Sequence, residues 1–99
     1  MNTIIDFCVI PIGVGVSVSK YIAEIQKILQ QSGLNYKMHA YGTNVEGEWD
    51  EVFAIVKVCH QAVHEMGAPR ISTSMRIGTR TDREQTMGDK IKSVEVKLS

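Results

Sequence analysis

The segment Tyr41–Val52, YGTNVEGEWDEV, carries more chemistry than a connection between a strand and a helix needs. It holds a threonine, an asparagine, several carboxylates and Trp49, which is the only tryptophan of the chain. No serine, cysteine or threonine of the sequence stands in a recognisable nucleophile motif. These residue types therefore indicate a binding surface rather than a catalytic one. The alternative is structural, with Trp49 acting as a hydrophobic staple for the helix that follows.

Two histidines are spaced as metal ligands on a helix can be. His60 and His64 form the pattern HxxxH, which places both imidazoles on one helical face. In the run HQAVH, however, Gln61 occupies the position at which zinc proteases carry their general base. His39, the third histidine, belongs to a different predicted element. We therefore predict structural histidines and no metal site.

The run GVGVSVS, residues 13–19, follows an apolar strand and opens a helix, which is where phosphate groups bind to free backbone amides. It matches the first two glycines of the GxGxxG pattern, but Val18 replaces the third. Tyr41 and Gly42, rather than a carboxylate, stand at the tip of the second strand, so a dinucleotide site is not expected. Two interpretations stay open, a flexible turn and a loop that touches a ligand.

Three arginines lie at the end of the last predicted strand and just after it, in the run MRIGTRTDRE. Arg76 lies within the strand, so its side chain has a fixed direction that suits a carboxylate or a ligand phosphate. Arg80 and Arg83 follow in a polar stretch, where they could equally form a solvated cluster with Asp82. Charge alone does not decide between these two interpretations.

Hydrophobic periodicity predicts the elements that must position these groups. Alternating apolar residues predict strands, and apolar residues at i, i+3, i+4 and i+7 predict helices. The predicted strands are 3–12, 35–41, 44–48 and 70–79, and the predicted helices lie within 17–33, 50–67 and 89–98. Ser17 or Ser19 is expected to cap the first helix, and Gly33 fits its left-handed end.

This order, β-α-β-β-α-β with an appended helix, is that of an α+β ferredoxin-like sandwich. At 99 residues we expect one domain, residues 1–99, because chains divide only when they are considerably longer. Both crossover helices would cover one face of the sheet. No element is left for the opposite face, so we predict self-association as a dimer or tetramer through the sheet faces.

The composition narrows the class of partner and the compartment. Eleven basic and eleven acidic residues cancel, which argues against nucleic acid as a partner. No apolar stretch is long enough for a membrane span, and the start of the chain lacks the basic region of a signal peptide. Cys8 and Cys59 lie in apolar patterns without metal or redox spacing, so we expect free thiols and a cytoplasmic protein.

Three blocks in order, VIPIG, YGTNVEGEWDEV and RISTSMRIGTRTD, give the chain a family resemblance. It resembles the YkoF-like small thiamine-binding family over nearly its whole length. The resemblance implies a ferredoxin-like fold, dimers or tetramers formed through the sheets, and binding of thiamine or its hydroxymethylpyrimidine part. It implies a carrier or a sensor rather than an enzyme, with no cofactor.

The resemblance also implies a pocket between the first strand–helix junction, the Tyr41–Trp49 segment and the end of the last strand. Aromatic rings would pack on the pyrimidine, hydroxyl and amide groups would orient it, Glu46 would oppose the thiazolium, and arginines would meet a phosphate tail. The implied ligand-binding residues are Ile12, Gly13, Ser17, Ser19, Tyr41, Thr43, Asn44, Glu46, Trp49, Arg76 and Arg80. The competing hypothesis is a regulatory or protein-interaction module of the same fold without a specific thiamine ligand.

Overall fold

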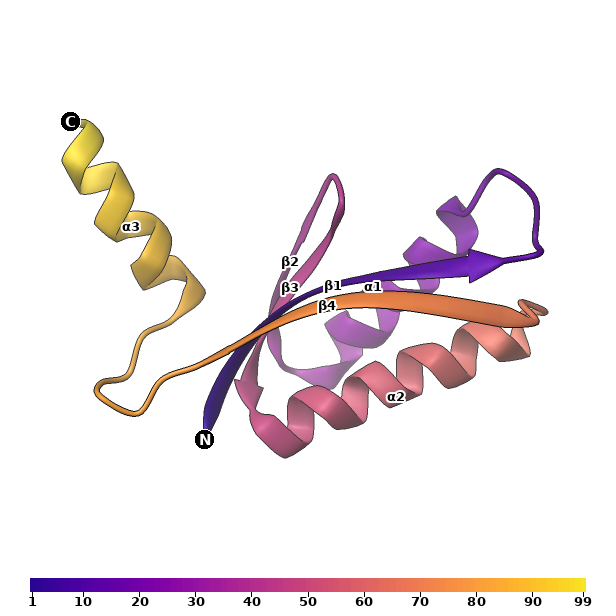
Figure 1. Ribbon diagram of the computed structural model, residues 1–99, viewed down its shortest axis with the longest axis horizontal. Coiled ribbons are helices and arrows are strands. Elements are labelled where there is room, and N and C mark those ends of the chain that lie inside the picture. The colour runs from indigo at the N-terminus through magenta and orange to yellow at the C-terminus, as the bar shows by residue number, and fades with distance from the viewer.

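The computed structural model describes residues 1–99 and contains four strands and three helices. Figure 1 shows their arrangement, with the C-terminal helix set apart from the rest. In chain order the elements are β1 (Asn2–Ile12), α1 (Ser19–Ser32), β2 (Asn35–His39), β3 (Gly42–Glu48), α2 (Trp49–Glu65), β4 (Arg70–Thr79) and α3 (Met87–Leu98).

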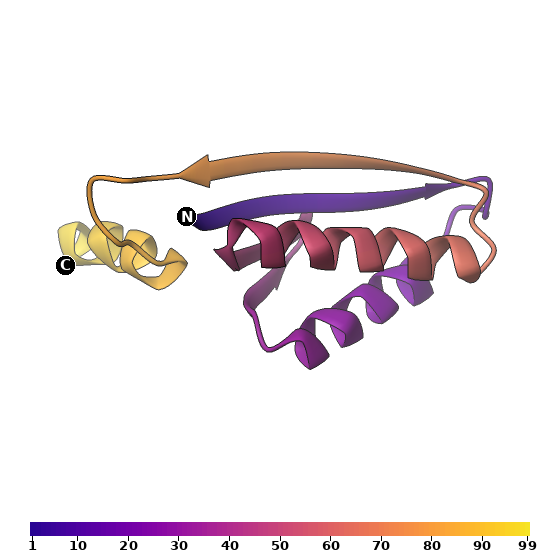
Figure 2. The same ribbon diagram turned by 90° about the horizontal axis from the view of Figure 1, so that it is seen from below.

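The strands form one antiparallel sheet in the order β2-β3-β1-β4. Both α1 and α2 lie on the same face of this sheet, as the side view shows (Figure 2). The ferredoxin-like α+β fold predicted from the periodicity is therefore confirmed, including the C-terminal helix. The opposite face, which we call the open face, has no helix packed along β1 and β4, and only the first turns of α3 come near it at one end (Figure 2).

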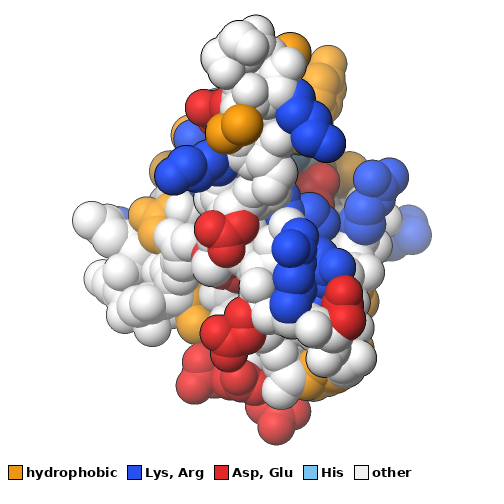
Figure 3. All heavy atoms as spheres, turned by 90° about the vertical axis from the view of Figure 1, so that its left-hand side faces the viewer, with side chains coloured by type: hydrophobic (Ala, Val, Ile, Leu, Met, Phe, Trp, Pro, Cys, Tyr) orange, Lys and Arg blue, Asp and Glu red, His pale blue; other side chains and the backbone are white.

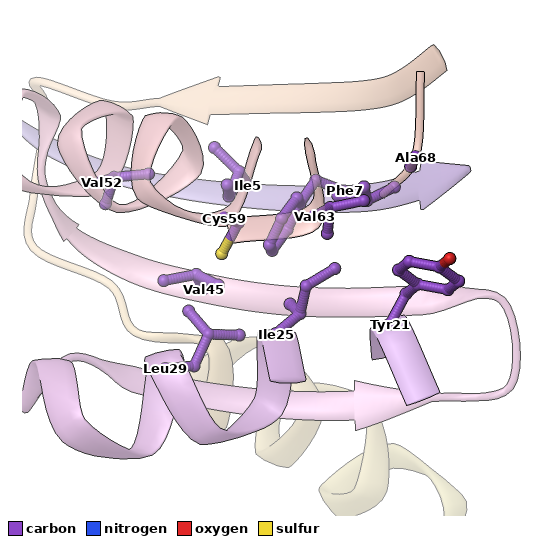
Figure 4. Packing of buried hydrophobic residues seen from close by; sticks show 11 residues of the cluster. Ile5, Phe7, Tyr21, Ile25, Leu29, Val45, Val52, Cys59, Val63 and Ala68 are labelled. Atoms are coloured by element: carbon purple, nitrogen blue, oxygen red, sulfur yellow. The ribbon is translucent and has the colours of Figure 1, made fainter. Parts of the chain in front are cut away.

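The core lies between α1, α2 and the helix-facing side of the sheet (Figure 4). Alternate residues of β1 point into it, because side chains in a strand alternate between its two faces. The helices meet them with residues spaced three and four apart, as the predicted stripes require. The buried apolar residues are Ile5, Phe7, Val9, Tyr21, Ile25, Leu29, Val45, Val52, Cys59, Val63 and Ala68.

The predicted ends of the helices are confirmed in part. Gly33 adopts φ of 78° and ends α1 in the left-handed conformation, as predicted. Asp50 lies in the first turn of α2, where a carboxylate favours the positive end of the helix dipole. The predicted serine cap of α1 is wrong: Val18 occupies the N-cap position and makes no side-chain cap, so neither Ser17 nor Ser19 has this role.

Helix α3 depends on its N-terminus for its position. Thr86 and Asp89 form a capping box, in which the threonine hydroxyl accepts from the Asp89 amide and the aspartate accepts from the Thr86 amide. The amide of Met87 donates to Glu46 Oε2 on β3 at 2.8 Å. No residue of α3 is buried, so this helix is tethered at one end and otherwise stands clear of the core.

The two cysteines are free, and they differ in environment. Cys8 is half-buried, whereas Cys59 is fully buried in the core. Burial raises the pKa of the Cys59 thiol to about 11. None of the three helices is both long enough and apolar enough to cross a membrane.

The histidines of α2 each have a protein partner. His60 Nε2 lies 2.6 Å from Thr73 Oγ1 on β4, and His64 Nδ1 lies 2.8 Å from the Ala68 carbonyl oxygen. No group of three histidine, cysteine or acidic side chains lies close enough together to hold a metal ion. Burial, followed by the neighbouring His64 imidazole, lowers the pKa of His60.

The lowered pKa of His60 makes stability depend on pH. The folded protein takes up this proton less readily than the unfolded chain, whose histidines titrate near pH 6.5, at about the usual value. Stability is therefore fully present above that value and falls as the pH drops through it toward the folded-state pKa. His60→Gln can still bond Thr73 but cannot titrate, so it should flatten the loss of stability measured by urea unfolding between about pH 7 and about pH 5. An identical slope in variant and wild type would contradict this assignment.

Candidate functional site

The register of the sheet separates the residues of the predicted site. Strand β3 runs antiparallel to β1, so its end lies beside the start of the chain, and the Trp49 amide donates to the Met1 carbonyl oxygen at 3.0 Å. Trp49 packs against Phe53, with ring centroids 4.6 Å apart. Ile12 and Gly13 lie at the other end of β1, where Gly13 approaches Pro69. Trp49 and the Gly13–Ser19 loop are thus at opposite ends of one long strand.

Glu46 is held by other groups of the protein. Its carboxylate accepts from Asn35 Nδ2 on β2 and from the Met87 amide at the start of α3. Only 9% of the residue is exposed. Glu46 therefore joins the edge strand to the C-terminal helix, and its two oxygens are both engaged.

Asn44 and Arg76 lie on the open face on either side of Asp6, which is the register partner of both. They border a hollow of about 370 Å³ that the first turns of α3 also line. Arg80 lies beyond the end of β4 and makes paired hydrogen bonds of 2.6 Å with the Asp82 carboxylate.

The Arg80–Asp82 pair keeps the pKa of the Asp82 carboxyl low, at about 2. Basic and acidic side chains are interspersed on the side of the molecule that carries this loop and α3 (Figure 3). Arg80 is thus in the solvated Arg–Asp arrangement that the sequence left open.

A different set of residues encloses an apolar hollow between α1, β1 and the β2–β3 hairpin, which we call the hairpin pocket. Its volume is about 250 Å³, and ten of its fourteen lining residues are hydrophobic. The lining residues are Phe7, Cys8, Val9, Ile10, Val18, Ile22, Ile25, Gln26, Met38, His39, Ala40, Tyr41, Gly42 and Thr43. Of the predicted site residues, Tyr41 and Thr43 belong to it; Ser17 and Ser19 flank its Val18 but do not line it.

The pocket exists because two paired strands differ in length. β1 continues to Ile12, but its ladder with β3 ends at the pair Phe7↔Thr43. The hairpin turns away there, and the space beside the rest of β1 is left without a strand. Helix α1 covers this space with Ile22 and Gln26.

Polar groups of the pocket are fixed by hydrogen bonds. Gln26 Nε2 donates to Thr43 Oγ1 at 2.9 Å, which orients the Gln26 amide. His39 Nδ1 accepts from the Tyr41 amide at 3.2 Å, and its Nε2 lies 2.6 Å from Asp6 Oδ1. The Tyr41 amide can only donate, so Nε2 carries the imidazole proton when His39 is neutral. Sequence reasoning missed Gln26 and His39, whose place beside the hairpin depends on the register.

Gly42 allows the hairpin to start close to β1. A Cβ atom at this position would lie 2.7 Å from the Phe7 carbonyl oxygen and 3.4 Å from Asp6 Oδ1. The absence of a side chain also leaves room for His39 to reach across β3 to Asp6. The pocket rim therefore requires glycine for steric reasons, with no need for a left-handed conformation.

The fold defines a small α+β protein, and comparisons with known proteins agree with this class. The sequence profile of the family described as thiamine-binding protein matches residues 5–95. The chain belongs to this thiamine-binding protein family.

A UPF0045 protein of Synechocystis sp. is 66% identical over 98 residues, which cover 99% of this chain and 81% of the relative. The crystal structure of the hypothetical protein MJ1052 of Methanocaldococcus jannaschii has a TM-score of 0.87 and 31% identity, covering 95% of this chain and 96% of that one. A structure from Thermotoga maritima, described provisionally as a thiamine biosynthesis or salvage protein, has a TM-score of 0.82 at 19% identity, covering 95% of this chain and 99% of that one. At that identity the likeness concerns the fold alone.

Replacing Gly42 by alanine should destabilise the hairpin. The added methyl group meets a backbone carbonyl, which cannot rotate away, so β3 must shift at a cost of about 1–3 kcal/mol. Gly88→Ala is the matched control, because its added Cβ would meet only Thr86 Oγ1 at 3.7 Å. Urea unfolding of both variants measures the difference, and equal stability of the two would contradict the steric requirement.

Proposed function

We propose that this protein binds thiamine, or its hydroxymethylpyrimidine part, in the hairpin pocket, and that it does so without catalysing a reaction. The observation that carries the proposal is an apolar hollow of about 250 Å³ with few polar groups, in a chain of the thiamine-binding protein family. Such hollows suit a small planar ring, because apolar walls gain from burial while a few fixed polar groups orient the ligand.

The pyrimidine ring is the part of thiamine that this pocket suits. Apolar side chains of β1 and α1 can pack on the two faces of the ring, and the exposed Tyr41 can close over it from the turn. Gln26 and Thr43 offer amide and hydroxyl groups to the substituents. The lining contains no carboxylate and no lysine or arginine, which favours an uncharged ring inside.

The cationic thiazolium belongs at the rim. Asp6, which contacts His39 there, has a side chain that is 45% exposed and supplies the negative charge. Glu46, which the family resemblance suggested for this task, is engaged with Asn35 and Met87. A phosphate tail that extends over the open face would meet Arg76, the register partner of Asp6.

Binding without chemistry agrees with the state of the reactive groups. Both nitrogens of His39 are engaged, one with Asp6 and one with the Tyr41 amide, so this imidazole offers no free base to Cys8. The buried Cys59 has a pKa raised to about 11, which leaves little thiolate at neutral pH. Two free thiols suit a reducing compartment, and we expect a carrier or sensor in the cytoplasm.

Calorimetric titration with thiamine tests the proposal. We expect saturable binding by the wild type and an affinity about five-fold lower, or about 1 kcal/mol, for Thr43→Val, because the Gln26 amide loses its partner. Thr79→Val, at the exposed end of β4, is the matched control and should bind as the wild type does. The absence of any heat at millimolar thiamine would reject the proposed function.

Cys8 reports whether the ligand occupies this pocket. It lines the hollow, whereas Cys59 is buried in the core, so a thiol reagent should modify Cys8 first in the free protein. Bound thiamine should slow that reaction. Thiamine binding without protection of Cys8 would place the ligand elsewhere.

We further propose that two copies of this chain associate through the open face and α3. Helix α3 presents Ile91, Val94 and Leu98 on one side, and Leu98 is 80% exposed. A helix of 12 residues is marginal on its own in water, so this side needs an apolar partner. Ile10 and Ile12 of β1 are also exposed at the far end of the open face, and a second copy would bury both surfaces.

Light scattering at micromolar concentration tests this association. The wild type should be a dimer or tetramer, and the double variant Val94→Lys with Leu98→Lys should have a lower mass, because charged groups replace the apolar side of α3. Ser93→Lys adds charge off this side and should leave the mass unchanged. A monomeric wild type would refute the proposal.

A further inference from the structure

The edge of β1 inside the hairpin pocket has no strand beside it. The ladder with β4 continues to the pair Ile12↔Arg70, whereas the ladder with β3 stops at Phe7↔Thr43. From Cys8 to Ile12 the strand is therefore paired on one side only. Its other side forms part of the wall of the pocket, which Cys8, Val9 and Ile10 line.

The alternation of a strand decides which main-chain groups lie on this free side. Three observations show that the odd-numbered residues of β1 turn their carbonyl groups toward β3. The Met1 carbonyl accepts from the Trp49 amide, the Ile5 carbonyl accepts from Asn44 Nδ2, and the Phe7 carbonyl faces Gly42. In an antiparallel sheet the N–H and C=O of one residue point to the same neighbour, and successive residues alternate.

Val9 and Pro11 are therefore the residues that face the free side. Proline has no N–H, so Val9 carries the only main-chain donor on this stretch, next to its own C=O acceptor. No turn residue or side chain bonds to either group. Val9 is 4% exposed, and its side chain lies in the core.

An unpaired donor and acceptor at a buried position are costly unless something in the pocket satisfies them. The rest of the lining is mostly apolar, so this pair is the strongest directional feature of the hollow. A ligand edge that places a donor next to an acceptor would complete the interrupted ladder, as a strand would.

We propose that the main-chain N–H and C=O of Val9 recognise the aminopyrimidine edge of the ligand. The ring nitrogen beside the amino group accepts from the Val9 N–H, and the amino group donates to the Val9 C=O. This inference rests on the proposed thiamine function and names the atoms that select the ring. Because the groups belong to the main chain, no side-chain motif in the sequence marks them.

The pattern predicts strong selectivity against the 4-oxo ring. Replacing the amino group by an oxo group turns the acceptor nitrogen into a donor and the donor substituent into an acceptor. The Val9 N–H then faces a ring N–H, and the Val9 C=O faces the oxo oxygen. Both buried main-chain groups therefore lose their hydrogen-bond partners. We expect the 4-oxo analogue of hydroxymethylpyrimidine to bind at least about 100-fold more weakly than the 4-amino compound.

Amide hydrogen exchange of the ¹⁵N-labelled protein, followed by NMR, tests the contact directly. The Val9 amide should exchange more slowly, by at least about ten-fold, when thiamine is bound. The Cys8 amide faces β4 and should be protected with or without ligand, so it serves as the control within the same strand.

The outcomes separate the two proposals. Thiamine binding with Cys8 thiol protection but no slowing of Val9 amide exchange would overturn the edge contact and leave the proposed function standing. Equal affinity for the 4-amino and 4-oxo rings would overturn it as well. A protein that binds no thiamine at all would refute the proposed function, and the edge contact with it.

Discussion

The unequal pairing of β1 is the constraint on which the rest of this structure depends. Both its neighbours are antiparallel to it, but β4 follows it to its end and β3 leaves it after Phe7. The paired half supports the core, because Ile5 and Phe7 meet residues of both helices there. The unpaired half gives the chain a pocket. One difference in strand length thus adds a pocket beside a strand whose side chains, Val9 included, still belong to the core.

The chemistry of the hairpin pocket follows from that break. A strand edge without a neighbour is usually a hazard, since it invites pairing with another chain. Here α1 and the hairpin turn shield the edge, and Pro11 removes one of its donors. What remains is the donor and the acceptor of Val9, with the Pro11 carbonyl as a second acceptor, among apolar side chains. This combination offers directional hydrogen bonds in an apolar lining that contains no carboxylate, lysine or arginine.

Glu46 connects the sheet to the helix that the core does not hold. Its carboxylate accepts from Asn35 on the edge strand and from the first amide of α3, so a single buried side chain sets where this helix begins. The hydrogen bond to a helix N-terminus also matches the dipole there. Beyond that tether α3 presents its apolar residues away from its own core. Apart from its capping box and this hydrogen bond, such a short helix has few contacts within its own fold to stabilise it.

The sequence by itself determined the order of elements, the fold class and most of the core. The reason is that helix periodicity is local, so the spacing of residues such as Ile25, Leu29 and Val63 indicates which side of each helix is buried. The sequence also indicated the family, through the three blocks VIPIG, YGTNVEGEWDEV and RISTSMRIGTRTD. Of the predicted site residues, Tyr41 and Thr43 line the hairpin pocket, and the others lie outside its lining.

Only the tertiary structure decided which of these residues meet. Trp49 and Gly13 each lie at or just before the start of a helix, so the sequence allowed them to meet, but the antiparallel register places them at opposite ends of β1. Glu46 has the chemistry of a ligand contact, yet Asn35 and Met87, which are distant in sequence, already engage it. The free edge at Val9 has no signature in residue type at all. It arises where a ladder stops, and the point at which two strands part is set by the packing of the whole sheet.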